Sequence, residues 1–247
     1  MTDKPLANRI ALVTGASRGI GAELALQLAQ AGAHVIAVAR TSGALEELDD
    51  KIKSAGGSAT LVPVDMKDGD GIARLALALN ERYGKLDVMV GNAGVLGPLS
   101  PLDHVERNDF ESNIAINVTA NWWLIRTMDA LLKRSDAGRA VFVTSGLGWH
   151  GRAYVGPYAA SKAALNMLVQ TYATESANTT VRVNAFSPGP TRTRMYASGW
   201  PGVDPATLNA PEDVAKAMLA LCLPSCTENG KVWNYADGRF LSFRVPE

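Results

Sequence analysis

The stretch Thr14-Gly15-Ala16-Ser17-Arg18-Gly19-Ile20-Gly21 joins an apolar, strand-like run at Ile10–Thr14 to an amphipathic run over residues 19–31. Glycines at such a turn let the backbone approach a pyrophosphate closely, and the N-terminus of the following helix directs free N–H groups toward it. A nucleoside-triphosphate P-loop would end in Gly-Lys-Ser/Thr, whereas Ala22-Glu23 follows Gly21 here. We therefore predict a dinucleotide-binding strand–turn–helix unit, and the alternative is a tight turn that binds no ligand.

The rest of the chain continues this alternation of strand-like and helix-like runs. In residues 19–31, Ile20, Leu24 and Leu28 form one apolar stripe, and Gly32 is placed to end the helix. The order is typical of an α/β fold in which helices cover both faces of a parallel sheet. The predicted strands are Ile10–Thr14, His34–Ala39, Ala59–Val64, Leu86–Gly91, Ala140–Ser145, Val181–Phe186 and Lys231–Tyr235. The predicted helices cover residues 19–31, 42–55, 69–83, 106–134, 157–177 and 211–222.

Size and charge limit the classes of function. A chain of 247 residues suits one domain, residues 1–247. Its 24 basic and 24 acidic side chains cancel, so it lacks the basic excess that nucleic-acid binding needs. No apolar run approaches the roughly 18 to 20 residues that cross a bilayer, and Ile10–Val13 is too short for a signal-peptide core. We expect a cytoplasmic protein that binds neither nucleic acid nor membrane.

The cysteines and histidines do not form a recognisable reactive set. Cys222 and Cys226 lack a second pair and are compatible with reduced thiols. The histidines, His34, His104 and His150, form neither an HxxxH pair nor a Ser/His/Asp spacing. We predict no metal site and no hydrolytic triad.

Short motifs follow the later predicted strands. Asn92-Ala93-Gly94 follows the fourth strand, Asn117 lies in the long helix, and Ser145 ends the fifth strand. Tyr158-Ala159-Ala160-Ser161-Lys162 opens the next helix, and Pro188-Gly189 follows the sixth strand. Over residues 9–238 the chain resembles the short-chain dehydrogenase/reductase family. The resemblance implies a single-domain, three-layer, doubly wound Rossmann fold with seven parallel strands, a nicotinamide cofactor, and a catalytic tetrad of Asn117, Ser145, Tyr158 and Lys162.

The residue types themselves suit proton transfer. Tyr158 and Lys162 are four residues apart, so they share one helix face. A unit positive charge about 4 Å away is worth about 4 kcal/mol at an effective dielectric of about 20, enough to lower a tyrosine pKa from about 10 to about 7. Ser145 would polarise a carbonyl, and the resemblance assigns to Asn117 a water that links Lys162 to solvent. The predicted reaction is hydride transfer between the nicotinamide and a carbonyl or alcohol carbon, with Tyr158 as general acid and base.

Each of these residues also has a structural explanation. A lone Tyr-x3-Lys pair is common on solvated helix faces. Asn117 could be a buried helix amide, and Ser145 a cap at a strand end. The three positions together favour the catalytic interpretation.

The end of the second predicted strand bears on cofactor choice. NAD-binding proteins place an acid there on the ribose 2′-OH, but this chain has Ala39 followed by Arg40. With Arg18, Arg40 would supply two guanidinium groups for a 2′-phosphate. We predict that NADP(H) is preferred, with NAD(H) as the alternative if Arg40 is only a solvated residue. By resemblance, the cofactor contacts are Gly15, Ser17, Arg18, Gly19, Ile20, Gly21, Arg40, Asp65, Met66, Asn92, Ala93, Gly94, Tyr158, Lys162, Pro188, Gly189, Thr191 and Thr193.

The substrate side is less determined. Residues 187–210, rich in Pro, Gly and Thr, are predicted to form a short loop over the active site, within the same domain, and to leave an open cleft. The candidates for the pocket wall suggest an apolar carbonyl or alcohol substrate, although each could equally be packing. They are Leu147, Trp149, Tyr154, Met195, Tyr196 and Trp200. Neither the substrate nor the physiological direction follows from them.

Two adjacent tryptophans in the predicted helix over residues 106–134 bear on the assembly of subunits. Trp122 and Trp123 point about 100° apart on a helix, so one can face the sheet and the other a second subunit. We expect a homodimer or homotetramer, although Asp237-Gly238-Arg239 departs from the Asp-Gly-Gly of many relatives at a common subunit contact. Two alternatives stay open: an NADP(H)-sensing regulatory protein without turnover, and a cofactor-assisted epimerase or dehydratase. The Tyr158/Lys162 pair argues against the sensor.

Overall fold

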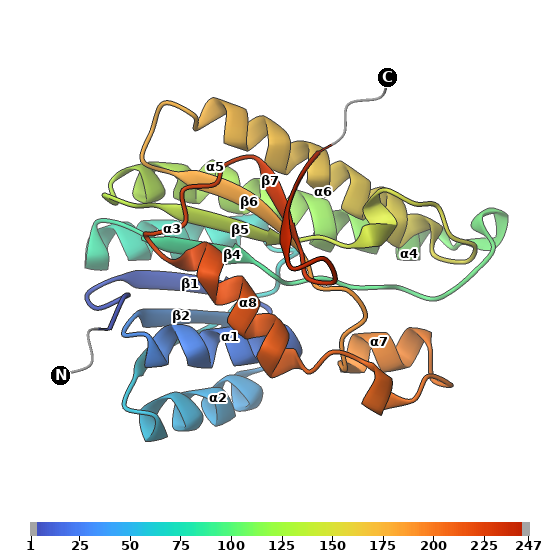
Figure 1. Cartoon of the computed structure of the whole chain (residues 1–247), viewed down its shortest axis with the longest axis horizontal. Coiled ribbons are helices and arrows are strands. Elements are labelled where there is room, and N and C mark those ends of the chain that lie inside the picture. Colours follow the sequence, from blue (N-terminus) through green and yellow to red (C-terminus); the bar gives the residue numbers. More distant parts are fainter. Residues whose placement is uncertain (1–3, 244–247) are drawn as a thin grey trace.

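A single sheet forms the centre of the molecule in the computed structural model, which describes residues 4–243 (Figure 1). Its order is β3-β2-β1-β4-β5-β6-β7-β8. Strands β1 to β7 run parallel and wind outward in both directions from β1 and β4, which confirms the doubly wound Rossmann architecture. The strands are β1 (Ile10–Thr14), β2 (His34–Ala39), β3 (Ser58–Pro63), β4 (Val88–Gly91), β5 (Arg139–Val143), β6 (Arg182–Ser187), β7 (Lys231–Asn234) and β8 (Arg239–Ser242).

The eighth strand corrects the prediction of seven. β8 pairs antiparallel with β7 after a turn in which Gly238 adopts a φ of +60°. Trp233 and Phe240 lie opposite each other in this pair, with their rings edge to face and their centroids 5.0 Å apart. Four residues with one large aromatic give a weak pattern in the sequence, and the strand is stabilised by this cross-strand contact, which partly buries both rings.

Helices cover both faces of the sheet (Figure 1). One face carries α1 (Gly19–Gln30), α2 (Ser42–Ser54) and α8 (Pro211–Cys222), and the other carries α3 (Gly69–Tyr83), α5 (Ala120–Lys133) and α6 (Gly156–Glu175). Successive strand residues point to opposite faces, so Ala11 and Val13 of β1 join the core beneath α1, while Leu12 joins the core beneath α5. Gly32, with a φ of +103°, follows α1 as predicted.

The predicted helix over residues 106–134 contains a wider turn. It consists of α4 (Arg107–Ile114), a π-helical segment η2 (Ala115–Thr119) and α5. In the π turn, the N–H of Ala120 reaches the carbonyl of Ala115, five residues back. Such turns insert one extra residue and are frequent at functional sites. Asn117 lies in this turn and is completely buried.

The segment 187–210 is more ordered than predicted. It contains a helix, α7 (Arg194–Gly199), whose N-terminus is capped by the Thr193 hydroxyl, and a 3₁₀ turn, η4 (Pro205–Thr207). Its two ends are tied together because Asn209 donates its N–H to Pro190 and accepts the N–H of Arg192. Figure 1 shows α7 standing clear of the sheet, near the start of α8. The remaining short turns are η1 (Leu102–His104) and η3 (Gly146–Gly148).

The two adjacent tryptophans of α5 point in different directions. Trp122 is 40% exposed, whereas Trp123 is partly buried and packs against the core beneath α3 and α5. This agrees with the expected geometry, and the subunit contact stays a prediction. Of the helices within residues 4–243, none combines the length and apolar character needed to cross a membrane.

Candidate active site

A cavity of about 800 Å³ lies at the carboxyl ends of the parallel strands, where open α/β sheets bind their ligands. This volume lies within the range of about 300 to 1,000 Å³ that is usual for cofactor and small-molecule sites. The wall runs from the glycine turn to the loop after β5 and to α7. All the residues predicted to contact the cofactor are on it, namely Gly15, Ser17, Arg18, Gly19, Ile20, Gly21, Arg40, Asp65, Met66, Asn92, Ala93, Gly94, Tyr158, Lys162, Pro188, Gly189, Thr191 and Thr193.

The glycine turn is held in place by the end of β4. The Asn92 side-chain amide donates to the carbonyls of Thr14 (2.9 Å) and Gly15 (3.3 Å). In return, the Thr14 hydroxyl accepts the backbone N–H groups of Asn92 (3.0 Å) and Ala93 (3.1 Å). A Cβ atom on Gly21 would overlap the Asn92 amide and the Gly15 carbonyl. Glycine is required there because two backbone segments and one side chain meet without room for a methyl group.

The N-terminus of α1 presents uncapped backbone N–H groups. Arg18 occupies the N-cap position in an extended conformation without a side-chain capping bond, and the first turn holds no acidic residue. Gly19, Ile20 and Gly21 all line the cavity. Free N–H groups at a helix N-terminus, with the positive end of the helix dipole, suit a pyrophosphate.

The end of β2 offers positive charge without an acid. Ala39 is the last residue of β2 and is buried, while Arg40 and Arg18 are exposed on the cavity wall. Within residues 4–243, neither guanidinium has an ion-pair partner. Asp65, after β3, uses one carboxylate oxygen to accept the Lys67 N–H at 2.9 Å. These residues fit a nucleotide that carries a 2′-phosphate.

Tyr158, at the start of α6, and Ser145 come together on the cavity wall. Ser145 does not end the fifth strand as predicted, because β5 stops at Val143 and Ser145 caps η3. Burial raises the pKa of Tyr158 above its usual value, and a side-chain hydrogen bond with Ser145 lowers it in part. The Ser145 hydroxyl also accepts the Leu147 N–H at 3.3 Å. The phenol is therefore protonated at neutral pH and is a proton donor.

Lys162 lies one turn further along α6, at the base of this pair. Its ammonium group donates to the Val143 carbonyl at 2.8 Å and lies 5.6 Å from the centre of the Tyr158 ring. The side chain is 3% exposed, and burial lowers the pKa of Lys162 to about 8. The lowering of the Tyr158 pKa that we expected from Lys162 is absent from the structure, because burial dominates and the ammonium is directed at a backbone carbonyl.

Asn117 lies behind the cavity wall rather than on it. Its Oδ1 accepts the Val95 N–H, and its Nδ2 donates to the Val95 carbonyl, both at 2.9 Å. Nδ2 also donates to the Ser161 hydroxyl at 2.9 Å. Since the side chain is occupied by protein partners, it anchors the loop after β4 to α6. Asn117 and Lys162 both lie beside Gly94, where an added Cβ would be 3.2 Å from Oδ1 and 3.7 Å from Nζ.

The predicted substrate-pocket residues separate into two groups. Leu147, Met195, Tyr196 and Trp200 line the cavity. Trp149 and Tyr154 are outside it. The Trp149 ring stacks on Phe243 with centroids 6.0 Å apart, and Tyr154 is 58% exposed with a φ of +71°.

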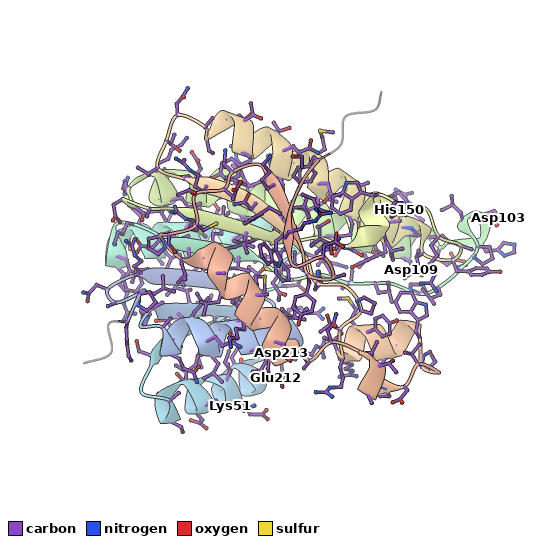
Figure 2. All side chains as sticks on the ribbon, viewed as in Figure 1. Lys51, Asp103, Asp109, His150, Glu212 and Asp213 are labelled. Carbon is purple, nitrogen blue, oxygen red and sulfur yellow. The ribbon has the colours of Figure 1, made fainter. Side chains whose placement is uncertain are left out.

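The cavity wall also contains residues that the sequence reasoning missed. Leu96 lies beneath α7, where a Cβ on Gly199 would overlap its side chain. His150, labelled in Figure 2, and Arg152 belong to the loop between η3 and α6. Arg192 lies just before α7, and Arg194 is the first residue of that helix. The signal in the sequence is the position of His150 and Arg152, which lie between Ser145 and Tyr158.

Metal-binding side chains do not gather in this part of the molecule. Across the residues that the structure describes, no three His, Cys, Asp or Glu side chains lie together in a way that could hold a metal ion.

Comparisons with known proteins agree with this geometry. Residues 9–202 match the family model described as short chain dehydrogenase. The chain is 36% identical over 219 residues to the uncharacterized oxidoreductase YciK of Escherichia coli K12, covering 87% of this chain and 86% of that protein. A solved short chain dehydrogenase from Pseudomonas syringae superposes with a TM-score of 0.91 at 38% identity, covering 94% and 96% of the two chains. One from Shigella flexneri, complexed with NADP, has a TM-score of 0.88 at 35% identity, covering 94% and 99%.

Proposed function

The chain belongs to the short chain dehydrogenase family and is an oxidoreductase. On that premise we propose that it transfers a hydride reversibly between NADP(H) and a carbonyl or alcohol carbon, with Tyr158 as general acid and base. The observation that carries the proposal is a single cavity that holds a nucleotide-binding turn and the Tyr158/Ser145 pair. Lys162 lies beneath that pair.

Ser145 and Tyr158 have different roles in carbonyl reduction. The nicotinamide, when bound, supplies the hydride. Ser145 donates a hydrogen bond to the substrate oxygen and stabilises the charge that develops on it. The Tyr158 hydroxyl, protonated at neutral pH because burial raises its pKa, gives its proton to that oxygen as the alcohol forms. In alcohol oxidation, the same oxygen atom of Tyr158 takes the proton back.

Lys162 and Asn117 act through position. The Lys162 ammonium lies 5.6 Å from the centre of the Tyr158 ring, and its hydrogen bond to the Val143 carbonyl holds the helix that carries Tyr158 against β5. Asn117 holds the backbone of Val95 and the Ser161 hydroxyl, so it fixes the loop after β4 against the helix that carries Tyr158.

The preference for NADP(H) rests on Arg18 and Arg40. Both line the cavity without an acidic partner in the described part of the chain, and Ala39 stands where an acid would bind a 2′-hydroxyl. The similar Shigella flexneri protein was solved with NADP. A hydrogen-bonded charge contact is worth about 1.5 to 3 kcal/mol, or roughly 10- to 150-fold in affinity.

A thermal-shift titration with NADPH and NADH tests the cofactor proposal. We expect NADPH to stabilise the protein at a concentration at least tenfold lower than NADH, and Arg40→Ala to remove most of the difference. At a hundred times its Kd, a ligand adds about 2.7 kcal/mol to the stability of the folded state. An equal response to the two nucleotides would overturn the preference, and no response to either would overturn the proposed function.

Turnover is tested by following NADPH absorbance with a pool of ketones and aldehydes. Tyr158→Phe should lose at least 100-fold in rate, because general acid catalysis contributes roughly 10²- to 10⁴-fold. Tyr154→Phe is the matched control, since Tyr154 lies four residues earlier, exposed and outside the cavity. Equal background in all three proteins would favour a sensor without turnover, and product without net NADPH change would favour an epimerase or dehydratase.

We also propose that the chain forms a homodimer or homotetramer through the surface of α5 that exposes Trp122. Arg126 lies 5.6 Å from the Trp122 ring, so the surface is partly apolar and partly cationic. Light scattering would show the mass of the assembly, and Trp122→Glu should reduce it. The cytoplasmic location stays a prediction.

A further inference from the structure

The acidic side chains of the cavity wall gather at one end, the end that also carries Arg18 and Arg40. At the end formed by the loop between η3 and α6, the wall carries His150 and Arg152. The acidic residues on the cavity wall are Glu23, Asp65 and Glu212, and they belong to α1, to the turn after β3 and to α8. Glu23 and Glu212 are close enough for the negative charge of Glu212 to raise the pKa of Glu23, after the larger effect of burial. Figure 2 shows Glu212 at the start of α8, well apart from His150.

Arg152 is held in place by an aromatic side chain. Its guanidinium carbon lies 5.1 Å from the centre of the Trp200 ring, and Trp200 packs in turn against Tyr196, with ring centroids 4.9 Å apart. A guanidinium over an indole keeps its N–H groups free, because the attraction uses the face of the cation rather than its hydrogen-bond donors. This contact gives the exposed Arg152 an aromatic neighbour and joins the loop before α6 to the residue that follows α7.

In residues 4–243, Arg152 makes neither an ion pair nor a hydrogen bond. By contrast, Arg139 donates to the carbonyls of Leu223 and Pro224, and Arg9 forms ion pairs with Asp87 and Asp136. An arginine that is positioned by a stack but left without an acceptor is suited to bind an anion from outside the chain.

Arg152 is distant in the fold from the residues assigned to the cofactor phosphates. Those are the N-terminus of α1 and the pair Arg18 and Arg40, near the ends of β1 and β2. Arg152 lies on the loop that connects Ser145 to Tyr158. Its guanidinium group is therefore on the side of the cavity where the substrate of Tyr158 would bind. The same cavity wall carries the apolar side chains of Leu96, Leu147, Met195 and Trp200, together with the basic residues Arg192 and Arg194.

We infer that the substrate is a carbonyl or alcohol compound with an apolar body and a carboxylate, and that Arg152 binds the carboxylate. This inference rests on the proposed function for the identity of the reacting group. The planar fork of a guanidinium matches a carboxylate in two parallel hydrogen bonds. The apolar side chains of the wall accommodate the rest of the substrate. The carboxylate of the substrate, bound by Arg152 at the end away from the reacting carbon, orients that carbon toward Tyr158 and Ser145.

Binding is measured first because it does not depend on turnover. The NADP⁺-loaded protein is titrated with naphthalene-2-carboxylate and with 2-naphthamide, which has the same shape and no charge. We expect the carboxylate to bind at least tenfold more tightly than the amide, and Arg152→Gln to abolish that difference. Arg82→Gln is the matched control, because Arg82 is an exposed arginine stacked 5.3 Å from the Tyr83 ring and lies outside this cavity. Equal affinity for the two ligands, or a preference that survives Arg152→Gln, would overturn the inference.

Turnover then separates the inference from the proposed function. The NADPH-dependent reduction of 4-formylbenzoate is compared with that of its methyl ester and of 4-formylbenzenesulfonate. We expect kcat/KM for the carboxylate to exceed that for the ester at least tenfold, with this ratio falling to about one in Arg152→Gln and staying at least tenfold in Arg82→Gln. If the ester is reduced as well as the acid, the inference fails and the proposed function stands. If the carboxylate binds through Arg152 but Tyr158→Phe turns over the whole panel like the wild type, the proposed function fails and the carboxylate site stands. A faster sulfonate would replace carboxylate as the preferred anion and overturn the stated class.

Discussion

The Lys162 ammonium donates a hydrogen bond of 2.8 Å to the carbonyl oxygen of Val143, the last residue of β5. This contact joins the helix that carries Tyr158 to the strand that leads into Ser145. The charge is almost completely enclosed, at 3% exposure, and burial lowers the pKa of Lys162 to about 8. The protein without cofactor therefore changes the charge of its active site within a range of pH that is easy to reach.

NADPH binding should become weaker as the pH rises above 8. Below that value Lys162 is charged in the free protein, and above it the free protein is largely neutral at this position. The anionic cofactor favours the charged form and raises the pKa of Lys162, so binding takes up a proton and the Kd increases by up to about tenfold per pH unit. We would measure the Kd by NADPH fluorescence between pH 7.5 and 9.5, above the range in which the 2′-phosphate titrates near pH 6.

Lys162→Met is the control for this pH dependence. It keeps a chain of similar length without the charge, so its Kd should be higher than that of the wild type at pH 7.5 and flat across the range. A wild-type Kd that is also flat would show that Lys162 keeps one charge state throughout. A slope that persists in the methionine variant would assign the proton to another group.

Gly21→Ala should disrupt the nucleotide turn. The new methyl group would overlap the Asn92 amide and the Gly15 carbonyl, and the carbonyl is backbone that cannot move aside alone. We expect a loss of about 1 to 3 kcal/mol in the free energy of unfolding, the usual cost of overpacking, and at least tenfold weaker NADPH binding. Gly43→Ala is the matched control because nothing lies within 4 Å of its added Cβ in α2. It should leave binding unchanged and raise stability by up to about 1 kcal/mol. Similar melting curves and affinities for the two variants would contradict the steric explanation.

Thr14→Val should weaken the same turn by a different route. The valine has the same shape but cannot accept the N–H groups of Asn92 and Ala93 or donate to the Val90 carbonyl, which the hydroxyl reaches at 3.2 Å. Two partly buried backbone donors would lose their partner, at up to about 1 to 3 kcal/mol each. At 2 to 4 °C per kcal/mol for a chain of this size, Tm should fall by roughly 4 °C or more. Thr14→Ser keeps the hydroxyl and should recover most of the loss, and a serine variant as unstable as the valine variant would show that the methyl group matters instead.

Asp87→Asn should destabilise the protein at the end of the sheet away from the cavity. The Asp87 carboxylate is completely buried and pairs with Arg9 (2.9 Å) and Lys85 (3.0 Å). It also accepts the Ser135 hydroxyl at 2.6 Å and the Ile10 N–H at 2.9 Å. Removing one partner of a buried ion pair costs about 3 to 5 kcal/mol, which chemical denaturation would measure. The affinity for NADPH should be unchanged below the melting range.

Asp136→Asn is the comparison for this buried carboxylate. Asp136 also pairs with Arg9, at 3.0 Å, but its side chain is 74% exposed. Exposed ion pairs contribute at most about 1 kcal/mol, so the variant should be nearly as stable as the wild type. If both substitutions had the same effect, the burial of Asp87 would not be the cause.

Sequence determined the architecture and the order of the motifs because both depend on local patterns. Apolar runs that alternate with amphipathic runs can bury their faces only as a parallel sheet between two helical layers. The turn at residues 14–21, Ser145 and the Tyr158/Lys162 spacing are likewise readable along the chain, since parallel strands bring their carboxyl ends to one edge of the sheet. Every predicted cofactor contact lies on the wall of one cavity for this reason.

Tertiary structure alone decided the features that depend on contacts between distant segments. β8 pairs with β7 where the Phe240 ring packs against Trp233. Asn117 lies behind the cavity wall because its amide group is hydrogen-bonded to Val95 and Ser161. Trp149 and Tyr154 lie outside the pocket, while Trp200, just after α7, contacts Arg152. The pKa values of Tyr158 and Lys162 also depend on the fold. Both shifts come mainly from burial, which depends on every segment packed around the group and cannot be read from the spacing of the two residues along the chain.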